Sequence, residues 1–398
     1  MAGGSRSKKR RRSRKRNPAE QLTDDLLVEI LARVPYRSLC RFRCVSTRWR
    51  ALISHPDNRA RLPQSLAGFF HIEPRPSGSP ARYSFTGVAE AGGPPLIHPS
   101  LSFLPDHERE LLGSCNGLLL CRCYRFPDKD EFDYLVVNPV TEESVAVPVS
   151  RPRPPLVQMA LLGFDPTFSS HFHVFEFQME AYDHDGFRYV PVVKIYSSAT
   201  GVWSRKQTDW SIGIMPWEGS SGAFVNCVMY FLAVHSIIGA VDVEGKTWRR
   251  IDFPYSEGSS FSPSFSGLSQ GQLHAAFGDG QKLNGKLEIW VLEDKDSEDW
   301  TLKHTISFKH LVGKKRVNLG LDFSVVAFHP DRNMVFFVFG HRKKTLMSYD
   351  MDSRRVYTIH NLGREKFLPY VPCSGYEKFL PYVPLFSKSL PDGANGNQ

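Results

Sequence analysis

The chain has 398 residues, of which 41% are hydrophobic and 12% aromatic. This composition excludes a globally disordered chain, and the length leaves room for two domains. The formal net charge is +9, but residues 6–16 alone hold nine basic and no acidic residues. The basic balance therefore belongs to an N-terminal tail and does not predict a nucleic-acid-binding surface on the remainder.

That arginine-rich tail opens the chain. Residues 5–16 contain no apolar side chain and cannot order themselves by burial, so we expect residues 1–18 to be a disordered basic tail. We interpret its basic run as a nuclear import signal, made of Lys8, Lys9, Arg10, Arg11, Arg12, Arg14, Lys15 and Arg16. There are two alternatives. The tail could be an arm that contacts nucleic acid or acidic surfaces, or a flexible arm that carries no targeting signal. Nucleic acid is the less favoured partner, because no RNP-type strand, Cys/His finger or dinucleotide fingerprint accompanies the tail.

Two further features predict a protein of the nucleus, the cytoplasm or both. No apolar stretch of the length of a secretory signal follows the tail. The chain has seven cysteines, an odd number without CxxC spacing, which favours free thiols in a reducing compartment over a disulfide framework.

Residues 22–56 predict three short helices. In the first, apolar side chains recur every four residues and two more widen the stripe: these are Leu22, Leu26, Ile30 and Val34, then Leu27 and Leu31. Thr23 is a suitable N-cap, and Pro35 ends the helix. We expect Ser38 to cap the second helix. The second and third helices carry the apolar residues Leu39, Phe42 and Val45, then Trp49, Leu52 and Ile53.

These helices carry more apolar surface than they can bury among themselves. A unit of fewer than about 40 residues rarely builds a core that stands alone. Part of its apolar surface must therefore be covered either by the rest of this chain, as in a packed helical subdomain, or by a partner protein.

The order of these residues resembles the F-box, the adaptor-binding module of Skp–cullin–F-box ubiquitin ligases. The resemblance extends over LTDDLLVEILARVP, residues 22–35, and SLCRFRCVSTRW, residues 38–49. Members of that family usually have Pro where Thr23 stands, so we expect weaker docking at most. The resemblance implies that a Skp-type adaptor, and through it a cullin, is bound by Leu22, Thr23, Leu26, Ile30, Leu31, Val34, Pro35, Leu39, Val45 and Trp49.

The sequence predicts an all-β domain over residues 61–386. Apolar and aromatic runs of about five to eight residues alternate with turn dipeptides. Units of roughly 40 to 50 residues recur, each ending in a strand, a polar turn and a last strand often opened by an aromatic residue. This pattern is typical of a β-propeller with about six to eight blades. A β-sandwich is the alternative, disfavoured because the repeat outlasts the usual length of a single sandwich.

This region resembles the F-box-associated, kelch-like propeller of plant F-box proteins. The resemblance is carried by GSCNGLL at 113–119, NPVT at 138–141, GFDP at 163–166 and LEIWVL at 287–292. It implies a domain that recruits a target protein, with binding residues in its loops, and it leaves the target unknown.

Two stretches need separate interpretation. Residues 222–243 are nearly all apolar and long enough for a membrane helix. Val, Ile, Phe and Tyr dominate them and they keep the repeat, so we predict two buried strands with Gly239 at a strand turn. The octapeptide EKFLPYVP occurs at 365–372 and again at 377–384, and we expect one copy to lie outside the core as a loop.

No residue pattern predicts catalysis. The motifs GxSxG, HExxH and the P-loop are absent, and the polar clusters at 107–108 and 183–185 are interpreted as solvated turns. Cys121 and Cys123 with His171 and His173 would form a metal site only through a strand pairing that the sequence does not predict, so we interpret them as ordinary strand residues. We expect a non-catalytic chain without cofactor or metal.

These predictions combine into a multidomain α plus all-β protein. Its parts are a basic tail at 1–18, a three-helix F-box module at 19–60, a kelch-like β-propeller at 61–386 and a flexible C-terminal tail at 387–398. The favoured function is the substrate-recognition subunit of a Skp–cullin–F-box ubiquitin ligase. A nucleic-acid-associated nuclear scaffold that uses the arginine-rich tail is the alternative. A propeller enzyme or a lectin would need a convergent polar pocket.

Overall fold

The computed structural model describes residues 22–34, 36–55, 58, 61–62, 66–73, 82–88, 101–104, 109–124, 132–148, 150, 157–180, 189–208, 214, 216, 222–233, 237–254, 262–279, 282–294, 299–319, 322–340, 343–364, 379–385 and 390. The chain separates into two compact units, Met1–Pro63 and Gln64–Gln398.

The described part of the first unit contains three short helices, as the sequence predicts. They are α1 (Asp24–Leu31), α2 (Tyr36–Phe42) and α3 (Thr47–Ser54). The expectation for Ser38 is wrong: α2 begins at Tyr36, so Ser38 lies inside the helix and does not cap it. The cap that the sequence interpretation missed is Ser46, whose Oγ accepts a hydrogen bond from the Trp49 backbone N–H at 3.1 Å and so begins α3.

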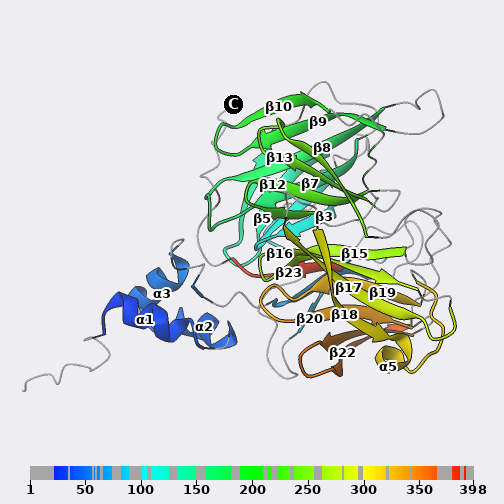
Figure 1. Ribbon diagram of the computed structural model, residues 1–398. Coiled ribbons are helices and arrows are strands. Elements are labelled where there is room, and N and C mark those ends of the chain that lie inside the picture. The colour runs from blue at the N-terminus through cyan, green and yellow to red at the C-terminus, as the bar shows by residue number, and fades with distance from the viewer. Residues whose placement is uncertain are drawn as a thin grey trace, which may run out of the picture. The chain divides into compact units, whose positions relative to one another are not determined.

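Four-stranded antiparallel sheets form most of the second unit (Figure 1). The first two contain β3 (Arg109–Cys115), β4 (Leu118–Tyr124), β5 (Phe132–Asn138) and β6 (Glu143–Val147), then β7 (Val157–Phe164), β8 (Phe172–Glu180), β9 (Tyr189–Ser197) and β10 (Val202–Gln207). The next two contain β11 (Ala223–Val225), β12 (Val228–Ala233), β13 (Ile237–Asp242) and β14 (Trp248–Asp252), then β15 (Ser262–Ser269), β16 (Gln272–Gly278), β17 (Lys286–Asp294) and β18 (Asp299–Ser307). The fifth contains β19 (Phe323–Phe328), β20 (Met334–Phe339), β21 (Lys343–Asp350) and β22 (Arg355–Arg364), and the short helix α5 (Phe308–Val312) precedes it.

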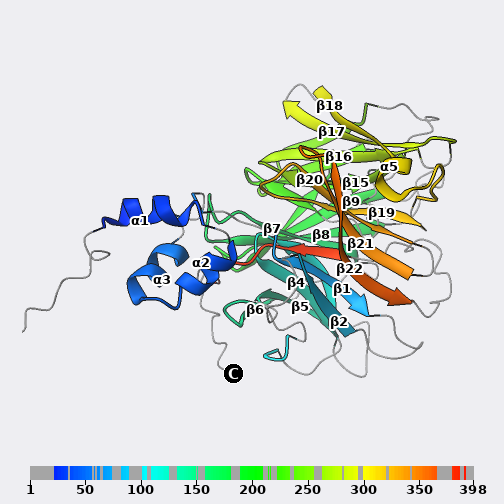
Figure 2. The same cartoon turned by 90° about the horizontal axis from the view of Figure 1, so that it is seen from below.

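A sixth, three-stranded sheet joins the two ends of this unit. In it β1 (Gly68–Glu73) lies between β2 (Arg82–Gly87) and β23 (Phe379–Tyr382). Figure 2 shows the red C-terminal strand beside the blue β1. The terminal strands of successive sheets contact one another in the order β3, β7, β11, β15, β19 and β23, and β23 contacts β3 again.

This closed ring is a six-bladed β-propeller. The predicted propeller is confirmed with a blade number inside the expected range, and a β-sandwich is excluded. Closure of the ring leaves no free edge at the inner strands. Apolar strands with free edges would be prone to pair with other chains. Aromatic pairs hold neighbouring blades together, such as Phe177 of β8 with Phe231 of β12, whose ring centroids lie 4.8 Å apart.

The apolar stretch 222–243 forms strands of the third blade. It contributes β11, β12 and β13, which is one strand more than predicted. Gly239 is not in a turn: it lies inside β13 opposite Phe231, and a Cβ at this position would come within 2.4 Å of the Phe231 ring. The glycine is therefore needed for close packing of that ring. In the part of the chain that the structure describes, none of the helices has both the length and the apolar character required to cross a bilayer.

The repeated octapeptide contributes to the ring through its second copy. Residues 379–382 of that copy are β23, and Phe379, Leu380 and Tyr382 are buried. The first copy, at 365–372, lies outside the described residues.

Three histidines with limited solvent access are kept neutral by the propeller. Burial lowers the pKa of His173, His274 and His329 to about 4, because the charged imidazolium loses its hydration. The Nδ1 atom of His329 accepts hydrogen bonds from the backbone N–H groups of Asp331 and Arg332, at 3.0 and 3.1 Å. Protonation of this nitrogen would remove both acceptor contacts from the turn between β19 and β20.

We expect the propeller to lose stability as the pH falls from about 6.5 to about 4. In that window the unfolded chain binds more protons than the folded chain, because the histidine pKa is higher in the unfolded state, so the free energy of unfolding decreases. The loss is at most about 3 kcal/mol for each histidine. His329→Asn keeps a side-chain acceptor for the same turn but cannot titrate, so it should flatten the pH dependence of the thermal unfolding midpoint. An unchanged dependence would contradict the role given to His329.

Candidate functional site

Helix α1 of the first unit begins at a capping threonine, as predicted. The Thr23 Oγ1 accepts a hydrogen bond from the Leu26 backbone N–H at 3.4 Å, and the Thr23 carbonyl accepts one from the Leu27 N–H at 3.0 Å. Asp24 and Asp25 occupy the first turn, where their charges complement the positive end of the helix dipole. The start of α1 is therefore determined by residues close to it in the sequence. From that start, the helical period decides which apolar side chains share a face.

One face of the helical unit is a closed core. Leu31, Leu39, Ile53 and Leu62 are buried against one another, with Val34, Phe42 and Trp49 packed around them. The Trp49 and Phe42 rings meet edge to face, with centroids 5.1 Å apart. This core uses side chains from all three helices, so it holds the helices in a fixed arrangement.

A second set of apolar side chains on this unit is exposed to solvent. Leu26, Ile30 and Val45 are 54%, 44% and 62% exposed. Leu26 and Ile30 lie one turn apart on α1 and therefore share a face. Leu27, which follows Leu26 directly, is fully buried. The exposed apolar face is defined here as Leu26 and Ile30 of α1, and Val45 is a further exposed apolar residue, in the turn between α2 and α3.

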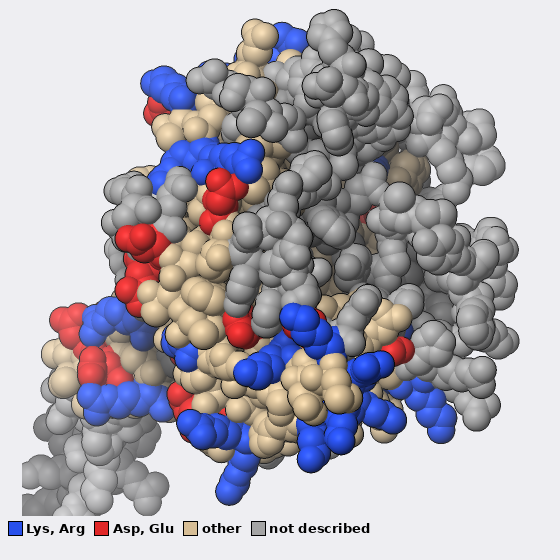
Figure 3. All heavy atoms as spheres, turned by 45° about the vertical axis from the view of Figure 1, so that its right-hand side comes forward, with Lys and Arg blue, Asp and Glu red and all other residues tan. Residues whose placement is uncertain are grey.

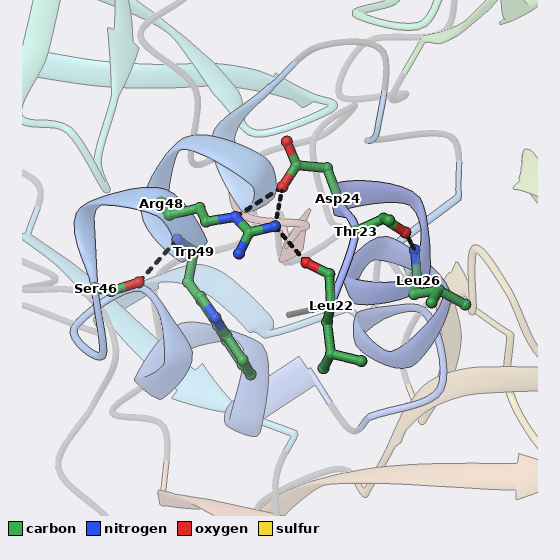
Figure 4. Close-up of polar contacts among 7 residues, drawn as sticks. All are labelled: Leu22, Thr23, Asp24, Leu26, Ser46, Arg48 and Trp49. Carbon is green, nitrogen blue, oxygen red and sulfur yellow. Dashed lines mark hydrogen bonds and ion pairs between the residues drawn. The ribbon is translucent and has the colours of Figure 1, made fainter. Parts of the chain in front are cut away.

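An arginine fixes the start of α1 against α3 (Figure 4). The Arg48 side chain donates to the Asp24 carboxylate through Nε at 2.8 Å and to the Leu22 carbonyl through Nη2 at 2.6 Å. Figure 4 shows the Leu26 side chain pointing away from this contact. The sequence does not predict this role of Arg48, because its partners lie at the start of another helix and no local pattern reveals them.

The ten predicted docking residues separate into groups by exposure. Leu26, Ile30 and Val45 are exposed, and so is the capping Thr23, whereas Leu22, Val34 and Trp49 are half-buried. Leu31 and Leu39 are 0% and 2% exposed, so they support the core of the unit and do not offer a surface. Pro35 lies outside the described residues, as does the entire basic run at 8–16.

The residues considered for metal binding do not converge. Among the described residues no group of three His, Cys, Asp or Glu side chains is arranged to hold a metal ion. Cys121 and Cys123 are buried strand residues, and burial raises the pKa of the Cys123 thiol to about 11. Both thiols are therefore protonated at neutral pH, because the pKa of Cys121 is raised further.

Family comparisons match both units. Residues 20–61 match the F-box domain. Residues 95–374 match the family described as F-box protein At3g26010-like, beta-propeller.

Similar proteins occur in Arabidopsis thaliana. F-box protein At5g07610 is 32% identical over 46% of this chain and 44% of its own length, so the chain spans less than two thirds of that relative. The putative F-box/kelch-repeat protein At1g15680 is 24% identical over 85% of this chain and 83% of its own. F-box protein At3g26010 is 25% identical, with 85% and 79% covered.

Proposed function

Since this chain belongs to the F-box proteins that carry an At3g26010-like β-propeller, we propose that it is the substrate-recognition subunit of a Skp–cullin–F-box ubiquitin ligase. The observation that supports this proposal most directly is the exposed apolar face. The helical unit has a closed core of its own, and Leu26, Ile30 and Val45 are left in solvent. An F-box implies a Skp-type adaptor as the protein that binds there, and a cullin is reached through the adaptor.

The proposed receptor does no chemistry itself. Transfer of ubiquitin takes place on other subunits, and the receptor raises the local concentration of the target near the charged conjugating enzyme. This division of labour requires one surface for the adaptor and another for the target. The propeller is the candidate for the second surface, which would bind the target protein.

Co-expression with a Skp-type adaptor tests the proposal. We expect the full chain and the adaptor to elute together in size-exclusion chromatography and to capture a cullin when one is added. A chain that is folded by circular dichroism but stays alone at micromolar concentration would overturn the receptor role.

The arginine-rich tail supports a nuclear or nucleocytoplasmic location within the same proposal. Deleting residues 6–16 should shift a fluorescently tagged chain from the nucleus to the cytoplasm and leave adaptor binding unchanged. If the deletion instead releases the chain from RNA or DNA at low salt without moving it between compartments, the scaffold alternative is favoured.

A further inference from the structure

Charge is distributed unevenly over the propeller. Residues 303–355 hold 11 Lys and Arg against 4 Asp and Glu. Outside this segment and the N-terminal run at 6–16, the chain holds 30 basic and 37 acidic residues. Outside the N-terminal run the net charge is therefore near zero only because an excess of positive charge on the fourth and fifth blades is offset by an excess of negative charge elsewhere. Figure 3 shows Lys and Arg gathered over the lower part of the molecule, where Figure 1 places α5 and β22.

The positive region is one continuous surface across two blades. Ring nitrogen Nε2 of His310, in α5, lies 3.1 Å from the Arg354 carbonyl oxygen in the turn between β21 and β22. Burial lowers the pKa of His304, and of the charges near this ring those of Lys303 and Arg354 lower it further, whereas that of Asp352 raises it. The backbone N–H of Asn284 donates to the Lys315 carbonyl at 3.1 Å, so the residues after α5 lie against the turn that precedes β17. We call this the basic surface, formed by the exposed residues Lys303, Lys309, Lys314, Lys315, Arg316, Arg354 and Arg355.

These cations lack acidic partners among the described residues, in contrast to Arg250 and Lys246 on the third blade. Arg250 pairs with Asp252 and Lys246 with Glu244, whereas no residue of the basic surface has an ion pair within the described ranges. Two described carboxylates at the turn between β21 and β22, Asp350 and Asp352, form no ion pair with these cations. Asp350 accepts hydrogen bonds from the backbone N–H groups of Asp352 and Ser353, and Asp352 accepts one from the Asn333 amide. The positive charge is thus left available to a second molecule.

Exposed apolar side chains lie among these cations. Of the large hydrophobic residues exposed in the described part of the propeller, Leu283, Leu302 and Tyr357 are on the same blades, at 61%, 42% and 44% exposure. Leu302 adjoins Lys303, at a point where β18 has an extra residue relative to β17. Tyr357 is two residues from Arg355 on β22, on the same side of the strand. Leu283 precedes Asn284, which contacts Lys315.

Edge protection alone does not account for this composition. Lysine and arginine on outer strands keep blades from pairing with other chains, and Lys303 and Arg355 fit that role. Lys309, Lys314, Lys315 and Arg316 are not on strands, however, so edge protection does not explain them. Unpaired cations beside exposed apolar side chains suit an acidic protein partner, because complementary charge steers the association and apolar burial stabilises the complex.

We propose that the basic surface, together with Leu283, Leu302 and Tyr357, binds an acidic protein segment that also carries apolar side chains. The phosphates of a nucleic acid would pair with the cations, but a nucleic acid would not bury the two exposed leucines. The inference concerns the propeller alone and does not depend on adaptor docking.

Fluorescence anisotropy with three probes tests the proposal on the full chain. The probes are a labelled peptide of alternating glutamate and leucine, a labelled peptide of glutamate alone and a single-stranded RNA, each matched in charge. We expect the mixed peptide to bind most tightly. The triple variant Lys303→Glu, Lys315→Glu and Arg316→Glu should weaken its binding at least about tenfold, because charge reversal replaces attraction by repulsion at three sites.

Two further variants separate the contribution of the cations at this site from that of overall net charge and from that of the apolar side chains. Arg205→Glu, Lys246→Glu and Arg250→Glu together make the same change in net charge on the second and third blades, and should change the affinity less than about threefold. Leu283→Ser with Tyr357→Ser should weaken the mixed peptide about tenfold and leave the glutamate peptide unaffected. The basic tail is identical in all variants, so it does not produce these differences. The proposal would be overturned if the two triple variants had equal effects. It would also be overturned if RNA bound more tightly than the mixed peptide and the charge reversal on the basic surface weakened RNA binding equally.

Discussion

Replacing Leu26 and Ile30 together by aspartate is expected to abolish binding of a Skp-type adaptor while leaving the helical unit folded. Both side chains are about half exposed, so the substitutions introduce no charge into the core formed by Leu31, Leu39, Ile53 and Leu62. Burying one large aliphatic side chain in an interface stabilises it by about 1.5–3 kcal/mol, and a buried unpaired carboxylate costs more than that gain. The affinity should therefore fall by at least about a hundredfold.

The matched control for this experiment lies on the second blade. Phe168 and Val202 are 71% and 61% exposed, and their joint replacement by aspartate makes the same chemical change on an exposed apolar surface of the propeller. We expect this control to bind the adaptor like the unmodified chain in isothermal titration calorimetry. If the variant at Leu26 and Ile30 binds as tightly as the control, the exposed apolar face is not the docking surface.

Tyr382→Ala is expected to destabilise the propeller by about 3–5 kcal/mol, because it removes a large aromatic side chain from a closed core. Tyr382 is fully buried in β23. Its ring packs against Phe70 and Phe85, with centroids 5.5 and 6.3 Å away, and its hydroxyl donates to the Gly117 carbonyl at 3.2 Å. The residue therefore joins the closing strand to β1, β2 and the turn between β3 and β4.

The repeated octapeptide supplies the control for this prediction. Tyr370 has the same sequence neighbours as Tyr382 but belongs to the copy that does not form β23. Tyr370→Ala should leave the free energy of unfolding, measured by chemical denaturation, within about 0.5 kcal/mol of the unmodified chain. Comparable losses for both variants would mean that the closing strand is not formed by the second copy alone.

Local patterns in the sequence predicted the elements well and their partners poorly. The cap at Thr23 depends on interactions within a few residues, so the sequence reveals it, and the tryptophans in the first two positions of β14 and β18 follow the repeat. The pattern of leucines in α1 could not separate Leu26, which is exposed, from Leu27, which is buried. That choice depends on where the other helices pack, and the contact of Arg48 with the start of α1 is hidden for the same reason.

The two copies of EKFLPYVP show most clearly which features the sequence determines and which depend on the tertiary structure. The sequence by itself determined three helices followed by a long series of antiparallel strands, because caps, turns and apolar periods are local. It could not decide which copy closes the ring, since the two are identical. The fold decides through distance. β22 is the outermost strand of its blade and continues to Arg364, so a chain returning to the inner ring must cross about 14 Å or more. Only two residues separate Arg364 from Phe367 in the sequence, too few to cover that distance, so the second copy forms β23.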